Sequence, residues 1–136
     1  MINKSKNLTN VYFLDKIRKS AVPDLLKRVD CCYVGALRND MFRFGICMNK
    51  LFDSMMSGKP LLYAVEAPNN FVEDYSCGVS VEPEDADALA AGIKKLISLS
   101  QEERDRMGQN GRNAVLEHYT YEKLARQFED VFEGRS

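Results

Sequence analysis

The sequence predicts an α/β fold, a Rossmann-like parallel sheet flanked by helices, and three observations lead to this prediction. Short apolar runs typical of buried strands alternate along the chain with segments that have helical periodicity. Several of these segments begin at a capping side chain or end at a glycine. The 136 residues include 45% hydrophobic residues, enough for one domain with a core. Strands that alternate with helices form a parallel sheet covered on both faces.

The first elements are expected before residue 40. A β-branched and aromatic run at residues 11–14 is typical of a strand. Pro23 can open a helix over the next residues, because proline is tolerated in the first turn. Residues 31–37 form an apolar run of the kind found in strands buried on both faces.

The middle of the chain predicts two helices and two strands. Residues 48–56 carry apolar side chains at helical spacing, and Gly58 can end that helix in the left-handed conformation. A strand over 60–65 follows, then a short helical segment near 70–76 and a strand over 77–83. The apolar stripe of the first helix consists of Met48, Leu51, Phe52, Met55 and Met56.

Three helices are expected in the last third of the chain, two of them within residues 100–133. Asp85 lies where an N-cap belongs, Ser100 and Glu103 fit a capping box, and Thr120 can cap the last helix. Each of two helices has an apolar face that predicts packing on a core. These faces are Ala86, Leu89, Ala90, Ile93, Leu96 and Ile97 in one helix, and Tyr121, Leu124, Ala125, Phe128, Val131 and Phe132 in the other.

Composition and charge exclude several classes of protein and site. A net charge of −1 without a basic patch gives no basis for nucleic-acid binding. No run approaches the roughly 20 apolar residues of a membrane span, and residues 1–10 lack the apolar core of a secretory signal. With one histidine and no Cys-x-x-Cys spacing, we expect buried, reduced thiols in a cytoplasmic protein and neither a metal nor a cofactor. The cysteines are Cys31, Cys32, Cys47 and Cys77.

The candidate site lies where loops leave the carboxyl ends of the strands, since parallel sheets bind ligands there. One such loop ends in the helix that starts near Asn49 and Lys50, and free N–H groups at a helix start favour an anion. Gly45 allows a close approach of the backbone. Asp53 shares a helical face with Asn49 and Lys50 and can accept hydrogen bonds from vicinal sugar hydroxyls. A phosphate near the N–H groups and sugar hydroxyls near the carboxylate together predict a nucleotide or nucleotide-sugar as the ligand.

A purely structural interpretation stays open for the same residues. Lys50 and Asp53 can form an exposed i,i+3 ion pair, and Asn49 can be an N-cap. A cation in the first helical turn opposes the helix dipole, however, which favours a functional role. Further candidates have weaker support, because surface, turn and cap roles also explain them. These are Arg38 and Arg43, which can meet phosphate, and Asn69 and Asn70, which can line the pocket.

Four segments in order resemble retaining GT-B glycosyltransferases of family four, in their nucleotide-sugar-binding C-terminal domain. They are VPDLLKRVD, NKLFDSMMSGKPLL, CGVSVEPEDADALAAGIKKL and EERDRMGQNGRNAVLEHYTYEKLA, and the resemblance extends over nearly the whole chain from about Asn10. In that family a Glu-x7-Glu motif precedes a Ser-Gly-x-Pro turn. Aligning the turn on residues 57–60 places Asp53 at the second glutamate, which contacts the nucleotide ribose, and Gly45 at the first.

The motif also departs from the usual pattern. The chain resembles a branch with Phe-Gly-x-Ser-x-Asn-Lys-Leu-Phe-Asp-Tyr at this place, with Cys47 replacing the serine. The first glutamate, which recognises sugar hydroxyls, is therefore absent, and the polar contact falls to Asn49 and Lys50. Such a domain normally opens with two more strand–helix units, and the resemblance implies that this chain, a single partial domain over 1–136, starts at the third strand.

The resemblance implies a transferase of the hexosyl type, moving a sugar from a nucleotide donor to a glycan or lipid-linked acceptor in surface polysaccharide synthesis. The acceptor is expected to bind a second, N-terminal domain, so this chain alone is expected to be inactive. The full-length enzyme is expected to be cytoplasmic, with membrane association open. Because the strand at 11–14 would lie far from that at 31–36, the sheet is expected to pair abnormally there or to expose an edge that forms a homodimer. Two alternatives stay open: a non-catalytic α/β interaction module, and another nucleotide-binding enzyme such as an epimerase.

Overall fold

A three-stranded parallel sheet forms the centre of the computed structural model, which describes residues 9–135. Its strands are β1 (Cys32–Gly35), β2 (Leu61–Ala64) and β3 (Gly78–Ser80), in that order across the sheet. Cys32 lies opposite Leu61, and Leu61 lies opposite Gly78. The predicted parallel α/β arrangement is confirmed. Residues 1–8 lie outside the described residues, and with them most of the segment predicted not to be a secretory signal.

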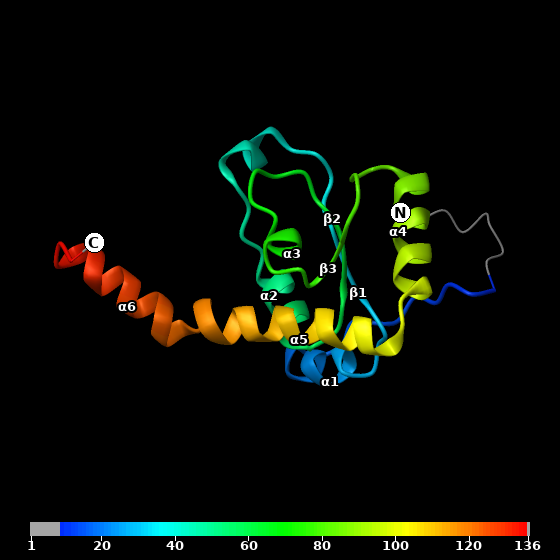
Figure 1. Cartoon of the computed structure of the whole chain (residues 1–136), viewed down its shortest axis with the longest axis horizontal. Coiled ribbons are helices and arrows are strands. Elements are labelled where there is room, and N and C mark those ends of the chain that lie inside the picture. Colours follow the sequence, from blue (N-terminus) through cyan, green and yellow to red (C-terminus); the bar gives the residue numbers. More distant parts are fainter. Residues whose placement is uncertain (1–8, 136) are drawn as a thin grey trace.

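Helices cover both faces of this sheet (Figure 1). Helices α2 and α3 lie on one face and α4 on the other, while α5 runs past the amino edge and packs on α2. Two short 3₁₀ segments, η1 and η2, precede α1 and α2. The bounds are η1 (Lys19–Ala21), α1 (Val22–Leu26), η2 (Asp40–Phe44), α2 (Asn49–Met56), α3 (Phe71–Asp74), α4 (Ala86–Ser98), α5 (Gln101–His118) and α6 (Tyr121–Phe132).

The predicted helix signals are confirmed one by one. The Asp85 carboxylate accepts hydrogen bonds from two backbone N–H groups of α4, and Ser100 with Glu103 forms a complete capping box. Thr120 caps α6 by accepting from the N–H of Lys123. Gly58 has a φ of +73°, the left-handed conformation expected after the end of α2. Local sequence therefore determines these helix ends.

The main core lies between the sheet and helices α2 and α5. Leu51 and Met55 of the predicted stripe are fully buried there, beside Val34 and Tyr63. A smaller cluster of Leu62, Val79 and Leu96 fills the space under α4.

The predicted inner face of α4 is only partly correct. Ile93 and Ile97 are 44% and 72% exposed, whereas Gly92 is buried. A Cβ atom at Gly92 would lie 2.6 Å from Val81 and 2.7 Å from Leu62, so the helix approaches the sheet most closely at its glycine. The helix is therefore rotated away from its two isoleucines.

The predicted strand at residues 11–14 is wrong, since no helix or strand forms between residues 11 and 18. Its side chains are exposed, with Tyr12 80% and Leu14 75% accessible. β1 pairs with β2 alone within residues 9–135, so the proposed pairing of 11–14 with 31–36 is also absent. A β-branched run needs a neighbouring strand for its hydrogen bonds, and none of the strands formed by residues 9–135 pairs with this segment.

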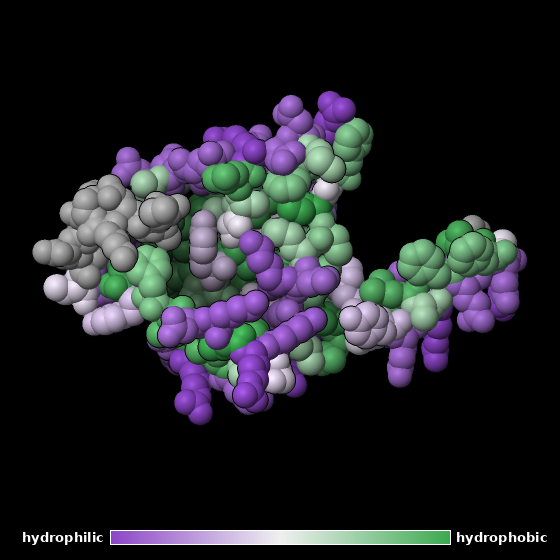
Figure 2. Space-filling model, turned by 180° about the vertical axis from the view of Figure 1, so that it is seen from behind, coloured by the Kyte–Doolittle hydropathy of each residue, from purple (hydrophilic) through white to green (hydrophobic). Residues whose placement is uncertain are grey.

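The prediction that α6 packs its apolar face on the core is wrong as well. Figure 1 shows the helix projecting from the body, and no residue of it is buried. Figure 2 shows hydrophobic residues along one side of this helix and hydrophilic residues along the other. Tyr121 and Phe132 are 93% and 85% exposed. Helical periodicity predicted the apolar stripe, but it carries no information on what the stripe contacts.

The prediction of buried thiols holds for two of the four cysteines. All four are free thiols, Cys32 and Cys77 are buried, and Cys31 is half-buried. Burial raises the pKa of the Cys31 and Cys77 thiols to about 11. Cys47 is exposed, which corrects the expectation that all four are buried; it follows the 3₁₀ turn η2 in a surface loop.

Candidate functional site at the carboxyl edge of the sheet

Helix α2 begins at the carboxyl edge of the sheet with an uncapped N-terminus. Its N-cap is Met48, which offers no side-chain hydrogen bond, and its first turn contains no acidic residue. Asn49 is the first residue of the helix, so the interpretation of Asn49 as an N-cap is wrong. The longer helices that follow are all capped, by Asp85, Ser100 and Thr120. Within residues 9–135, the N–H groups of Asn49 and Lys50 at the start of α2 therefore have no hydrogen-bond partner, and the helix dipole is uncompensated there, which favours an anion.

Lys50 adds a cation next to these N–H groups. Its ammonium donates to the carbonyl of Gly35, 3.0 Å away, which places it over the carboxyl end of β1. Within residues 9–135 no ion pair joins Lys50 to Asp53, so the i,i+3 pair of the structural interpretation does not form. The exposed ammonium keeps donors for a further acceptor.

The loop before α2 turns at Gly45, which has a φ of +95°. The side-chain amide of Asn69 holds the next residue through two hydrogen bonds. The Ile46 N–H donates to Asn69 Oδ1 over 2.8 Å, and Asn69 Nδ2 donates to the Ile46 carbonyl over 2.7 Å. Gly45 and Asn69 line one hollow together with Cys47 and Phe71. The structure thus brings together two of the predicted residues from separate loops.

Asp53 lies one turn further along α2, in a different groove. The groove has a volume of about 390 Å³ and runs between α1, α2 and α5. Its walls combine apolar side chains, among them Val22, Pro23, Leu26 and Met56, with the charged side chains of Lys19, Lys27, Asp53 and Arg112. The Asp53 carboxylate is exposed. Its oxygens are available to accept hydrogen bonds from a bound hydroxyl.

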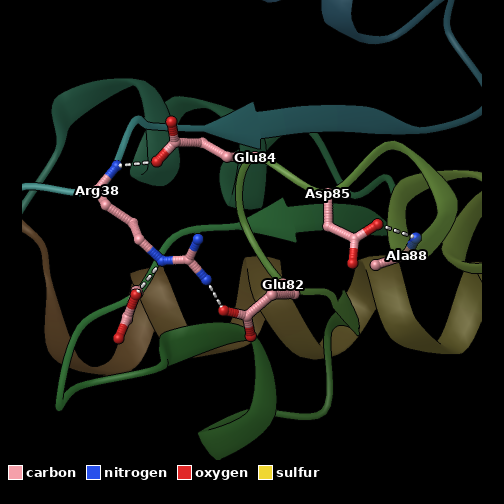
Figure 3. A network of polar contacts seen from close by, with 6 residues as sticks. Arg38, Glu82, Glu84, Asp85 and Ala88 are labelled. Carbon is pink, nitrogen blue, oxygen red and sulfur yellow. Dashed lines mark hydrogen bonds and ion pairs between the residues drawn. The ribbon is translucent and has the colours of Figure 1, made fainter.

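Arg38 occupies the carboxyl edge beside β2 and β3 (Figure 3). Its Nε donates to Glu66 over 2.6 Å, another guanidinium nitrogen contacts Glu82, and its backbone N–H donates to Glu84 over 2.9 Å. The bonded Glu66 carboxylate raises the pKa of Arg38. Two carboxylates on the guanidinium and a third on the backbone N–H of Arg38 leave this part of the edge negative, so an anion is favoured near Lys50 instead.

Arg43 and Asn70 have structural partners of their own. The Arg43 guanidinium lies over the ring of Phe44, 4.6 Å from its centroid, and Arg43 lines a hollow that also contains Glu66. Asn70 caps α3 and donates to the Ser80 hydroxyl over 2.8 Å. Neither residue lies in the hollow of Gly45 and Asn69 or in the groove of Asp53.

Sequence reasoning missed the Arg38 network. The signal was present in the sequence, because each of these residues follows shortly after a strand. Arg38 follows β1, Glu66 follows β2 and Glu82 follows β3. The carboxyl ends of parallel strands meet at one edge, which brings the three side chains together.

Two kinds of feature are absent from residues 9–135. No group of three or more His, Cys, Asp or Glu side chains in this range could hold a metal ion. In the same range, no helix combines the length and the apolar character that crossing a bilayer requires.

Comparison with known proteins gives one family and one similar structure. Residues 1–114 match the model of a family described as glycosyl transferases group 1. No curated protein matches the sequence. The fold is similar to that of sucrose-phosphate synthase from Thermosynechococcus elongatus, with a TM-score of 0.74 and 21% identity. That match covers 90% of this chain and 29% of the synthase chain, so the likeness concerns the fold of less than a third of that protein.

Proposed function

Because the chain belongs to the family of glycosyl transferases group 1, we propose that it binds the nucleotide-sugar donor of a glycosyltransferase. The observation that carries the proposal is the uncapped start of α2, with Lys50 beside it and Asp53 one turn further on. Four residues of a helix span about 6 Å. The distance from Asn49 to Asp53 along α2 therefore suits a diphosphate at the helix start and a ribose next to it.

Each part of the donor has a chemical counterpart on this surface. The free N–H groups of α2 and the Lys50 ammonium suit a diphosphate, which they would hold by charge-assisted hydrogen bonds. Asp53 suits the vicinal ribose hydroxyls, and the apolar side chains of Val22 and Pro23 in its groove suit a base. Asn49 would add an amide donor, and the turn at Gly45 leaves room for the ligand. No catalytic base or nucleophile is assigned.

The wider role is part of the same proposal. A hexosyl group would pass to a glycan or a lipid-linked acceptor in surface polysaccharide synthesis, with the acceptor bound by a second domain. In that reaction this chain would hold the donor and neutralise the leaving diphosphate. The site would be cytoplasmic, and residues 1–136 alone would bind the donor without transferring its sugar.

Calorimetric titration of the chain with UDP, GDP, ADP and TDP tests the proposal. One of them is expected to bind at a single site, and glycosyl transfer from the corresponding nucleotide-sugar is not expected. If all four fail to bind, the donor site is refuted and the non-catalytic interaction module is favoured. Sugar transfer by this chain alone would contradict the proposed need for a second domain.

The free edge of β1 supports a homodimer in the isolated chain. β1 hydrogen-bonds to β2 on one side only within the described residues, and Tyr33 in β1 is 59% exposed. Unpaired strand edges associate with other strands. Sedimentation velocity is expected to show a monomer–dimer equilibrium that shifts with concentration. A single monomeric species across the whole concentration range would contradict the dimer.

A further inference from the structure

We propose that Asn69 is a positioning residue whose side-chain amide fixes the Gly45 loop in front of the N-terminus of α2. The inference rests on the proposed function, in which a diphosphate must pass this loop to reach the start of α2. It also revises the expectation that Asn69 contacts the donor directly. The amide is already engaged by the protein backbone.

The contact between Asn69 and Ile46 is reciprocal. The side-chain carbonyl accepts from the Ile46 N–H and the side-chain NH₂ donates to the Ile46 carbonyl, at 2.8 Å and 2.7 Å. Among side chains, only a carboxamide presents a donor and an acceptor side by side in the way a peptide group does. The two bonds hold Ile46 as a neighbouring strand would, although the residue lies in a loop outside the sheet.

Gly45 and Asn69 fit each other sterically. A Cβ atom at Gly45 would lie 3.1 Å from Asn69 Oδ1, and the φ of +95° is one that side chains rarely adopt. The glycine therefore permits both the turn and the close approach of the amide. Three residues after Ile46, α2 begins. A shift of Ile46 would therefore displace the free N–H groups at the start of α2.

A second tie joins the same two loops further along. Arg38, after β1, donates to Glu66, after β2, over 2.6 Å. The loop over 36–48 is thus attached to the loop over 65–70 near both of its ends, by Arg38 with Glu66 and by Ile46 with Asn69. Of the two ties, the Asn69 contact is the one adjacent to α2, and its loss is expected to affect the phosphate end of the ligand.

NMR titration of the ¹⁵N-labelled chain tests this role with two probes. The first is whichever of UDP, GDP, ADP and TDP the wild-type chain binds most tightly, and the second is its nucleoside. Asn69→Ala is expected to weaken binding of the diphosphate about tenfold while changing nucleoside binding less than about twofold. Asn69→Ser, which can make only one of the two hydrogen bonds, is expected to fall between wild type and Asn69→Ala.

Asn39→Ala is the matched control. Asn39 lies in the same loop, and its side chain also accepts from a backbone N–H, that of Met41 at 2.9 Å, but within residues 9–135 no hydrogen bond joins it to Gly45 or Ile46. This variant is expected to bind both probes as wild type does. Thermal melting by circular dichroism establishes that each variant is folded. If Asn69→Ala is not folded, the comparison of wild type with Asn69→Ser tests the positioning role.

The outcomes separate this inference from the proposed function. If the wild-type chain binds none of the diphosphates, both are refuted. If it binds one and Asn69→Ala binds it equally well, the positioning role is refuted and the donor site stands. Equal losses for diphosphate and nucleoside would also refute the role, because they would indicate a general structural defect.

Discussion

Gly108→Ala is expected to destabilise the chain by about 3 kcal/mol. A Cβ atom at this position would lie 1.9 Å from the carbonyl oxygen of Gly58, 2.4 Å from its carbonyl carbon and 2.9 Å from the nitrogen of Lys59. All three are backbone atoms in the turn between α2 and β2, and they cannot move aside as a flexible side chain would. Helix α5 must therefore withdraw from the amino edge of the sheet, which loosens its packing on α2.

Urea unfolding followed by circular dichroism measures this effect, with Asn113→Ala as the control. Asn113 is exposed on the same helix, so its replacement is expected to change the free energy of unfolding by less than about 0.5 kcal/mol. Helix propensity alone would make Gly108→Ala stabilising by about 1 kcal/mol. An unchanged or increased stability would therefore show that α5 does not pass this close to Gly58.

Asp53→Ala is expected to lower the affinity for a nucleoside diphosphate about tenfold and to change stability by less than about 0.5 kcal/mol. The carboxylate is exposed and has no ion-pair partner within residues 9–135, so the folded chain loses little without it. A ribose that donates two hydrogen bonds to it would lose charge-assisted contacts. Calorimetry and urea unfolding of the same preparations measure the two quantities.

A 2′,3′-dideoxy nucleoside diphosphate identifies the contact more closely. The wild-type chain is expected to bind it more weakly than the ribose form, whereas Asp53→Ala is expected to bind both forms alike. Asp105→Ala, which removes an exposed carboxylate from α5, serves as the control and should retain wild-type discrimination. Wild-type affinity in Asp53→Ala would mean that this carboxylate has no role in the donor site.

Features that depend on a few neighbouring residues could be predicted from the sequence. The caps at Asp85, Ser100 and Thr120 and the left-handed Gly58 follow from local hydrogen bonding and backbone sterics, and all are confirmed. The parallel sheet follows from the alternation of strands and helices. The resemblance to the C-terminal domain of GT-B glycosyltransferases is likewise confirmed by the family match and the fold.

Features that depend on contacts between distant parts of the chain could not be predicted from the sequence. The run at 11–14 has strand-forming residues but no strand beside it, and the apolar face of α6 has no partner surface among the described residues. Both failures have the same cause, because a pattern states which face is apolar and not what covers it. In α4, a single close approach at Gly92 decides which side faces the sheet.

For the candidate site, the sequence predicted where its residues lie along one helix, but not the contacts that they make. The sequence placed Asn49, Lys50 and Asp53 on one helical face, and all three are exposed on α2. It did not predict that Lys50 reaches back to Gly35 or that Asn69 is occupied by Ile46. These contacts join segments 15 and 23 residues apart, and their partners are backbone atoms, which every residue offers.

The central claim is that the free N–H groups at the start of α2 bind the diphosphate of a nucleotide-sugar. Amide chemical shifts of the ¹⁵N-labelled chain, recorded with inorganic pyrophosphate and then with the best-binding nucleoside diphosphate, test it most directly. Saturable shifts at Asn49 and Lys50 are expected with both ligands, and shifts near Asp53 with the nucleotide alone. Binding of the nucleotide without any change at Asn49 and Lys50 would contradict the claim.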